Sequence, residues 1–212
     1  MRVDLSGFID PRMNLDYDDQ LLRSAEAGAG EVLRFWESPS YFVVLGRTCK
    51  EQEDVAGEAC RRDNIPVLRR SSGGGTVLQG PGCLNFAVVL VKNNNAALAS
   101  ITGSYGHILG KVVRAMKGLG VEAVFRPVCD LALASTDRKF SGNAQRRGRN
   151  CILHHGTILY GFDLDRIGQY LKMPNKMPGY RNARSHDLFV ANIPARPEEI
   201  RRAITASFLC GS

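Results

Sequence analysis

Three consecutive glycines, Gly73, Gly74 and Gly75, most constrain the fold of this chain, because they separate two apolar segments. Consecutive glycines cost chain entropy, so such a run indicates a sharp bend or a close approach of the backbone to another group. Arg69 and Arg70 precede the glycines and carry planar, permanently charged guanidinium groups that suit a phosphate or a carboxylate. A hairpin turn beside a solvated basic pair is the simpler interpretation, but both features together, ahead of an apolar strand, favour a ligand site.

The glycine-rich segment does not follow the common nucleotide-binding motifs. GxxxxGK[ST] is absent, and Leu78 stands where a GxGxxG motif that begins at Gly73 needs its last glycine. The residues after the glycines are predicted to form a strand, so a phosphate bound at a helix N-terminus is not expected here. We expect the glycines to let a strand backbone lie against an elongated, uncharged ligand.

Two segments together resemble the signature of the lipoate-protein ligase A family, part of the wider biotin/lipoate protein-ligase superfamily. The first segment contains Arg69, Arg70, Ser71, Ser72, the three glycines, Thr76 and Val77, followed by Gly82–Phe86. The second contains Asp130, Leu131, Arg138–Gln145 and His154–Leu159. Order and separation both fit the family, and the resemblance extends from about Asn14 to about Ile193, which is nearly the whole chain.

The resemblance implies one catalytic domain over residues 1–212, with the fold of class II biotin and lipoyl synthetases and without the C-terminal accessory domain of typical single-chain ligases. The chain shows no internal repeat and no linker, and its patterns predict an α+β domain with a mostly antiparallel sheet flanked by helices. Strands are predicted at 31–36, 41–45, 65–69, 84–91, 121–125, 130–134, 139–144 and 151–160. Helices are predicted at 15–27 after an Asn14 cap, at 49–62 with a Thr48/Glu51 capping box, at 101–119 after a Ser100 cap, at 164–171 and at 197–208.

Composition argues against several classes of protein. The net charge is +7, but the arginines are not interleaved with aromatic residues and no nucleic-acid-binding signature is present, so an acidic protein or a phosphate-bearing ligand is the expected partner. Six scattered cysteines without a CxxC pair are typical of reduced cytosolic thiols. No apolar run could span a membrane and no signal-peptide core is present, so we expect a cytoplasmic protein without membrane partners.

Metal binding by protein ligands alone is not expected. His154 and His155 are adjacent on a predicted strand, so their side chains point to opposite faces and make a poor metal pair. Resemblance implies that the His-Gly-Thr segment lines an acyl tunnel, where its residues shape the site without donating protons.

Lys139 is the predicted catalytic residue, and the resemblance implies that it contacts the acyl carbonyl and the phosphate of an acyl-adenylate. A fixed ammonium stabilises the negative charge that develops on oxygen when a carbonyl is attacked. Arg138 cannot replace it, because adjacent strand residues face opposite ways. The remaining predicted substrate- and nucleotide-binding residues are Arg69, Arg70, Ser72, Gly73, Gly74, Gly75, Thr76, Asn85, Asp130, Ser141, Gly142, Asn143, Ala144, His155, Gly156 and Thr157.

Several of these residues have a specific expected role. Asp130 is expected to bind the adenine or help place Mg²⁺, with an ordinary strand-end carboxylate as an equal alternative. Gly142 is expected to leave room beside the nucleotide, Asn143 to supply amide hydrogen bonds, and Asn85 to tie strand backbone together. Gln79 stands where many relatives carry histidine, which weakens any proton-transfer role at that position.

The resemblance implies an enzyme that uses ATP and Mg²⁺ to convert lipoate, or octanoate, to an acyl-adenylate and then acylates a lysine of an acceptor lipoyl domain. Lipoyl domains are typically acidic, which suits the positive net charge. Three explanations of the absent accessory domain stay open: a separate subunit supplies it, this chain is a compact form that works alone, or it is a transferase that does not need the domain. An acyltransferase that takes the acyl group from acyl-carrier protein through Cys129 is the alternative, since related octanoyltransferases use a cysteine nucleophile. A binding module without catalysis is a third hypothesis, and the intact lysine signature argues against it.

Two polar segments are predicted to be irregular, Met173–Ala191 and Arg146–Arg149. The first contains or adjoins a basic set, and the like charges of these residues repel when no anionic ligand is present: Lys172, Lys176, Arg181 and Arg184. We therefore predict that at least one of the two segments is mobile in the free protein and becomes ordered over an adenylate.

Overall fold

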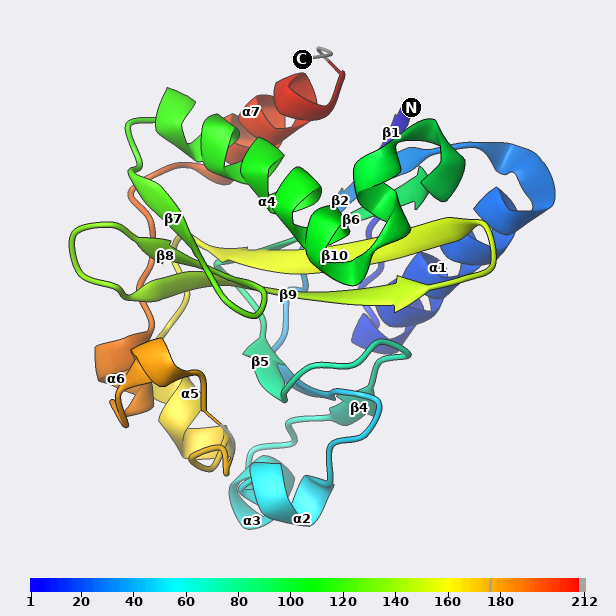
Figure 1. The fold of residues 1–212 in the computed structure, drawn as a ribbon. Helices are drawn as coiled ribbons and strands as arrows, with labels where there is room; N and C mark the ends of the chain where they lie inside the picture. Colours follow the sequence, from blue (N-terminus) through cyan, green and yellow to red (C-terminus); the bar gives the residue numbers. More distant parts are fainter. Residues whose placement is uncertain (176, 210–212) are drawn as a thin grey trace.

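A computed structural model of the chain describes residues 1–175 and 177–209 and is built around a seven-stranded sheet (Figure 1). Along this sheet the strands are β1 (Arg2–Asp4), β2 (Val32–Trp36), β6 (Cys83–Val91), β10 (Cys151–Leu159), β9 (Lys139–Arg147), β8 (Asp130–Leu133) and β7 (Ala123–Arg126). β1 and β2 run parallel, and all other neighbouring pairs in this sheet are antiparallel. The predicted α+β fold with a mostly antiparallel sheet is confirmed.

A smaller sheet of three strands carries the glycine-rich segment (Figure 1). Its central strand β3 (Phe42–Leu45) lies between β4 (Val67–Arg69), which is parallel to it, and β5 (Val77–Gln79), which is antiparallel. Residues 70–76 connect β4 to β5, and we call them the glycine loop. Short helices surround this sheet at the bottom of Figure 1, namely α2 (Glu51–Asp54), α3 (Gly57–Arg62), α5 (Asp165–Tyr170) and α6 (His186–Phe189).

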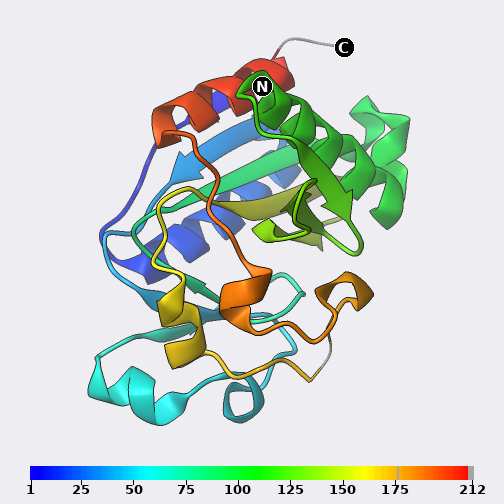
Figure 2. The ribbon, with the colours of Figure 1, turned by 90° about the vertical axis from the view of Figure 1, so that its left-hand side faces the viewer.

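Longer helices cover both faces of the large sheet, because successive strand residues point alternately into two apolar clusters. These helices are α1 (Pro11–Ser24), α4 (Ile101–Gly118) and α7 (Pro197–Leu209). Val88 on β6 packs with α4 and α7, whereas its neighbours Ala87 and Val89 pack with α1. Figure 2 shows α4 and α7 on one side of the sheet and α1 on the other. None of the helices among the described residues has the length and apolar character needed to cross a membrane.

The predicted N-terminal helix is present but begins earlier than expected. Asp10 caps α1, since its carboxylate accepts from the Arg12 backbone N–H at 2.9 Å, and Pro11 occupies the first helical position. Asn14, the predicted cap, is instead buried inside the helix, where its side-chain amide donates to the Phe8 carbonyl at 2.7 Å. The Asp-Pro pair decides the start, because proline has its φ preset for the first turn and lacks the N–H that would be unsatisfied there.

The predicted single helix over 49–62 is wrong, because α2 and α3 are separate short helices. Val55 between them is extended, with φ −116° and ψ 137°, and it bridges to Leu171. The predicted capping box is also wrong, since Lys50 holds the N-cap position and no side chain caps α2. Here a tertiary backbone contact overrides the local helical preference.

The two segments predicted to be irregular contain more regular structure than expected. Within 173–191 lie a short turn of 3-10 helix, Gly179–Arg181, and α6, and Phe189 at the end of α6 is buried in an apolar cluster. Lys176, part of the predicted basic set, lies outside the described residues. β9 extends through Arg147, past its predicted end at Ala144, so half of the second segment belongs to a strand.

Candidate active site

The guanidinium group of Arg70 lies inside the bend of the glycine loop. Arg70 Nη2 donates to the carbonyls of Gly73 at 2.7 Å and Gly75 at 2.8 Å, and Nε donates to Ser72 Oγ at 3.1 Å. Burial of this group lowers the Arg70 pKa from its ordinary value. Gly74 has a φ of +85°, and a Cβ there would lie 2.9 Å from Arg70 Nη2, so both backbone and packing demand glycine at this position.

Arg69 holds the neighbouring loop between β3 and α2. Its Nη1 donates to the carbonyls of Gly46 and Cys49, both at 2.8 Å. A Cβ on Gly46 would lie 2.0 Å from the Gly74 carbonyl oxygen, so the two loops are in direct backbone contact. Both arginines thus bind backbone carbonyls, and their expected contact with a phosphate or carboxylate stays a prediction.

Ser72 connects the glycine loop to the large sheet. Ser72 is 1% exposed, and its Oγ lies 2.6 Å from His155 Nε2 on β10. The other ring nitrogen, His155 Nδ1, lies 3.8 Å from Oδ2 of Asp18, which also forms a buried ion pair with Arg34 at 2.6 Å. Two predicted site residues from distant parts of the sequence are therefore brought into contact.

The glycine loop also approaches strand β9. A Cβ on Gly74 would lie 3.7 Å from the Cβ of Ala144, another predicted site residue. Ala144 is followed two residues later by Arg146, which pairs with Asp19 of α1 at 3.1 Å, and Asp19 in turn accepts from the hydroxyl of Ser71. The two motif-bearing segments therefore face each other, with helix α1 beside both of them.

Acidic residues that hold the glycine loop were missed by the sequence analysis. Asp54 of α2 accepts from the Thr76 hydroxyl, and Asp19 of α1 accepts from the Ser71 hydroxyl. Asp18 of α1 lies 3.8 Å from Nδ1 of His155, the partner of Ser72. Both α1 residues are close to the start of the helix predicted over 15–27, but the earlier helix start places them near the middle of α1. One signal was present, because Asn14 and Asp18 share the helical spacing of the buried leucines, and polar residues in an apolar stripe indicate a specific role.

Lys139 forms an ion pair with Asp130 across the neighbouring strands β9 and β8. Lys139 Nζ lies 2.8 Å from Asp130 Oδ1, and Asp130 Oδ2 accepts from the Tyr180 hydroxyl at 2.7 Å. Burial and the Asp130 charge raise the Tyr180 pKa, so this hydroxyl stays a protonated donor. A Cβ on Gly142 would lie 2.9 Å from Lys139 Nζ, so this glycine makes room for the lysine amine itself.

Arg138, the neighbour of Lys139, holds segment 173–191 in place. Its Nη2 donates to the Asp187 carbonyl at 2.7 Å and its Nε donates to the Val190 carbonyl at 3.0 Å. From the segment, Arg184 donates to the Asp137 carbonyl at 2.9 Å. The segment therefore lies along the turn between β8 and β9, with Tyr180 reaching the carboxylate that holds the catalytic candidate.

Asn143 bridges β9 to the turn that precedes β8. Its Nδ2 donates to the Cys129 carbonyl at 2.9 Å and to Ser141 Oγ at 3.1 Å. A Cβ on Gly156 would lie 1.9 Å from Asn143 Oδ1, so the glycine of the His-Gly-Thr segment is needed to accommodate this amide. Thr157 Oγ1 accepts from a backbone N–H of β9 at 3.4 Å. These side chains bind one another across the two strands and give the floor of the site a fixed shape.

Other polar residues of the site lie at the junction of the two sheets. Asn85 on β6 donates to the Cys83 carbonyl at 3.3 Å, a bond to strand backbone of the expected kind. Among the buried side-chain atoms of the described residues, Trp36 Nε1 and Gln79 Oε1 lack a hydrogen-bond partner. Such unpaired buried atoms are rare and indicate a place for water or for a polar ligand atom.

Cys129 lies directly before Asp130 and is half-buried. Burial and the charge of Asp130 raise the pKa of its thiol, so the thiolate is disfavoured. A cysteine nucleophile needs the opposite shift. The surroundings of Cys129 therefore do not favour the acyl-enzyme alternative.

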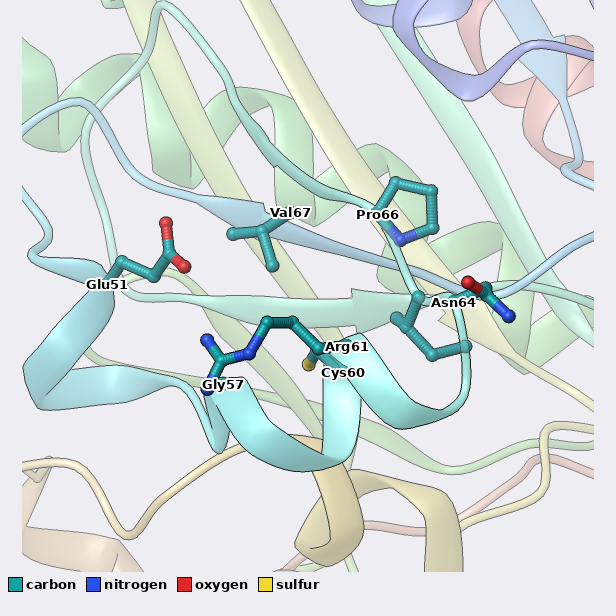
Figure 3. Close-up of a pocket in the computed structure, with 8 residues that line it drawn as sticks. Glu51, Gly57, Cys60, Arg61, Asn64, Pro66 and Val67 are labelled. Carbon is teal, nitrogen blue, oxygen red and sulfur yellow. The ribbon is translucent and has the colours of Figure 1, made fainter.

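The predicted site residues do not line the surface hollow beside the small sheet. A surface hollow of about 420 Å³ lies on the outer side of the small sheet (Figure 3), and it is lined by Glu51, Gly57, Cys60, Arg61, Asn64, Ile65, Pro66 and Val67. None of these is a predicted site residue. Within residues 1–175 and 177–209, no group of three or more histidine, cysteine or acidic side chains is placed to hold a metal ion.

The mostly antiparallel sheet with flanking helices is the fold of lipoate-ligase-like catalytic domains. Residues 10–208 match the family described as the lipoyl protein ligase A/B catalytic domain. The chain belongs to this family.

Individual relatives agree with this assignment. The chain is 32% identical over 169 residues to the Schizosaccharomyces pombe protein named "Putative lipoate-protein ligase A", and it spans 43% of the length of that protein and 79% of its own. The bipartite lipoate protein ligase of Thermoplasma acidophilum, described with its E2 lipoyl domain, has a TM-score of 0.85 at 28% identity, covering 98% of this chain and 81% of that one. A lipoate-protein ligase A bound with ATP has a TM-score of 0.82 at 27% identity, covering 98% of this chain and 83% of that one.

Proposed function

We propose that this chain catalyses the ATP-dependent ligation of lipoate to a protein. The observation that carries the proposal is the meeting of the two motif-bearing segments, where Ser72 contacts His155 and Gly74 lies beside Ala144 on the strand that begins with Lys139. An acyl-adenylate needs both parts, a close-fitting backbone for the acyl chain and a fixed cation for the phosphate and carbonyl. The ATP found in a similar ligase supports the nucleotide.

In the first step, a carboxylate oxygen of lipoate attacks the α-phosphorus of ATP, and the bond to pyrophosphate breaks. The product is lipoyl-AMP, and Lys139 exchanges its partner Asp130 for the phosphate. Mg²⁺ bound with ATP would neutralise phosphate charge, and Asp130, which pairs with Lys139 in the free protein, would help to hold it together with phosphate oxygens.

In the second step, the amine of an acceptor lysine attacks the acyl carbonyl of the adenylate. The carbon–oxygen bond to AMP breaks, and the amine nitrogen releases a proton as the amide forms. Lys139 stabilises the oxyanion that develops on the carbonyl, while the glycine loop holds the acyl chain in line. Octanoate fits the same sequence of steps, because the reacting carboxylate is identical.

The acceptor in this proposal is a lipoyl domain. A similar ligase is described as bipartite and with its E2 lipoyl domain, which supports both the acceptor and a separate accessory subunit. The net charge of +7 suits the approach of an acidic domain, since complementary charge speeds encounter and disfavours wrong partners.

Release of pyrophosphate from ATP upon addition of lipoate tests the proposal. We expect release with this chain alone or together with a candidate accessory subunit, and incorporation of lipoate when a lipoyl domain is added. Omission of lipoate is the control for ordinary ATP hydrolysis. Absence of lipoate-dependent release under both conditions would refute the ligase assignment.

A further inference from the structure

His154 lies in a continuous chain of buried hydrogen bonds that the proposed mechanism does not use. It is fully buried on β10, and its Nδ1 lies 3.1 Å from Gln145 Nε2. On the other side of the ring, His154 Nε2 lies 3.2 Å from Asn143 Oδ1. Because Asn143 Nδ2 donates to the Cys129 carbonyl at 2.9 Å, this chain of hydrogen bonds ends at the turn directly before Asp130.

At its other end, beyond Gln145, this chain of hydrogen bonds is connected to helix α4. The hydroxyl of Ser104 lies 2.9 Å from Gln145 Oε1, and Arg147 Nη1 donates to the same hydroxyl at 3.1 Å. The imidazole of His154 is packed between aromatic rings, with Phe86 stacked at 5.9 Å and Tyr105 edge-on at 5.5 Å between ring centres. The ring therefore has little freedom to turn.

A backbone carbonyl sets the direction of the hydrogen bonds from Asn143 through His154 to Gln145. The Cys129 carbonyl can only accept, so the Asn143 amide must turn its Nδ2 toward it and its Oδ1 toward the imidazole. His154 Nε2 must then carry the proton, which leaves Nδ1 to accept from Gln145. Burial holds the His154 pKa down to about 3, so the ring is neutral and keeps this one tautomer.

We propose that His154 is a positioning residue for the ligation reaction, which through Asn143 fixes the Cys129 carbonyl and with it the Asp130 that holds Lys139. The inference rests on the proposed function. Cys129 and Asp130 are consecutive, so a shift of this carbonyl moves the carboxylate that lies 2.8 Å from Lys139 Nζ. A histidine that changes neither charge nor tautomer keeps this turn in one position while charged substrates enter and leave.

The tautomer is tested first, by ¹⁵N chemical shifts of the histidine rings in the unmodified protein. We expect His154 to show the Nε2–H tautomer without titration between about pH 5 and 9, as a buried neutral ring should. His107, His155 and His186 provide the comparison signals in the same sample. An Nδ1–H tautomer, or titration of His154 in this range, would overturn the proposal without any assay of activity.

The second test separates positioning from folding. His154→Phe keeps an aromatic ring beside Phe86 but removes both ring nitrogens, and Gln145→Leu removes the donor to Nδ1 from the half-buried end of the chain. We expect each variant to lower kcat for lipoate-dependent pyrophosphate release by about 10- to 100-fold, because a small misplacement of reacting groups has an effect of this size. The KM for lipoate should stay within about twofold of that of the unmodified protein. Ile152→Val, a buried packing change on the same strand, is the matched control and should leave kcat within about twofold.

Each outcome decides a different point. If both variants fold and keep the kcat of Ile152→Val, the positioning role is refuted. If His154→Phe fails to fold, Gln145→Leu decides alone, because it leaves the aromatic packing intact. If the unmodified protein releases no pyrophosphate, the ligase proposal and this role fall together, while the ¹⁵N shifts still decide the hydrogen-bond direction separately.

Discussion

The glycine loop and segment 173–191 both contact strand β9, but they are held there in different ways. The glycine loop reaches β9 at Ala144 and is fastened by buried or half-buried side chains of α1, α2 and β10. Segment 173–191 reaches β9 at Lys139, where the buried Phe189 and a backbone bond from Ala191 anchor its end. Its other contacts with the site are made by arginines that donate to backbone carbonyls and by the hydroxyl of Tyr180.

This difference indicates which part of the site is preset and which part can respond to a ligand. The bend of the glycine loop depends on a positive φ at Gly74 and on the 1%-exposed Ser72, and side chains from α1, α2 and β10 hold it, so changing its shape would require breaking several contacts at once. Hydrogen bonds such as those that hold segment 173–191 contribute about 1 kcal/mol each to stability, and water can replace them. We therefore expect the loop to have its final shape before substrates bind and the segment to adjust to them.

The largest expected effect is that of Lys139→Ala. Loss of the fixed cation should lower lipoate-dependent pyrophosphate release by about 10²- to 10³-fold, the usual cost of removing a group that stabilises developing charge. Arg138→Ala is the matched control, because it removes an adjacent cation that holds only segment 173–191. Equal losses in the two variants would show that Lys139 has no special role.

Gly74→Ala tests whether the glycine loop is preset. A side chain at φ +85° and 2.9 Å from Arg70 Nη2 should lower the free energy of unfolding by about 1–3 kcal/mol. Gly73→Ala has no neighbouring atom within 4 Å and no positive φ, so its cost should stay within about 0.5 kcal/mol. Urea unfolding of both variants measures the difference, and similar costs would mean that the bend tolerates a side chain.

Tyr180→Phe tests whether segment 173–191 is the adjustable part. Loss of the bond to Asp130 should lower local stability by about 1–2 kcal/mol and speed amide hydrogen exchange in this segment, leaving the glycine loop unchanged. Faster exchange in both regions would contradict the distinction between them.

Hydrogen exchange with and without a bound adenylate analogue tests whether the polar segments respond to a ligand. In the unmodified protein, a saturating non-hydrolysable lipoyl-AMP analogue should increase hydrogen-exchange protection in Met173–Ala191 or Arg146–Arg149, because its charge offsets their mutual repulsion. Unchanged protection in both segments would count against ordering of either segment over the adenylate.

The smallest expected effect is that of Cys129→Ser. Since the raised pKa keeps this thiol protonated, the change should alter pyrophosphate release by less than about twofold. Intact-protein mass after incubation with octanoyl-carrier protein should show no thioester. A thioester adduct that is lost in Cys129→Ser would favour the acyltransferase alternative.

The parts of the fold that the sequence predicted are those with a strong local pattern. Helix α4 follows the helical period along its whole apolar stripe and begins at the predicted Ser100 cap, and the strands predicted at 139–144 and 151–160 are present as β9 and β10. Local pattern failed where a distant contact decides the conformation, as at Val55, whose bridge to Leu171 divides the helix predicted there.

The candidate site shows the same limit. Its motif residues could be named from the sequence, but the side chains that hold them could not. Asp19 contacts the glycine loop and Tyr180 contacts Asp130 only because the chain folds back over long distances, and no local spacing records such pairs.

The long-range contacts of the glycine loop also bear on the order in which this protein folds. Ser71 meets a partner 52 residues earlier in the chain, and Ser72 meets one 83 residues later. Closing such long stretches of chain is slow and is rewarded only when both ends are already formed. Because Asp18 joins α1 to β2 through Arg34 and approaches His155 on β10, the loop can take its shape only after helix α1 has docked on the sheet. We therefore expect the residues around the three glycines to be among the last to become structured as the chain folds.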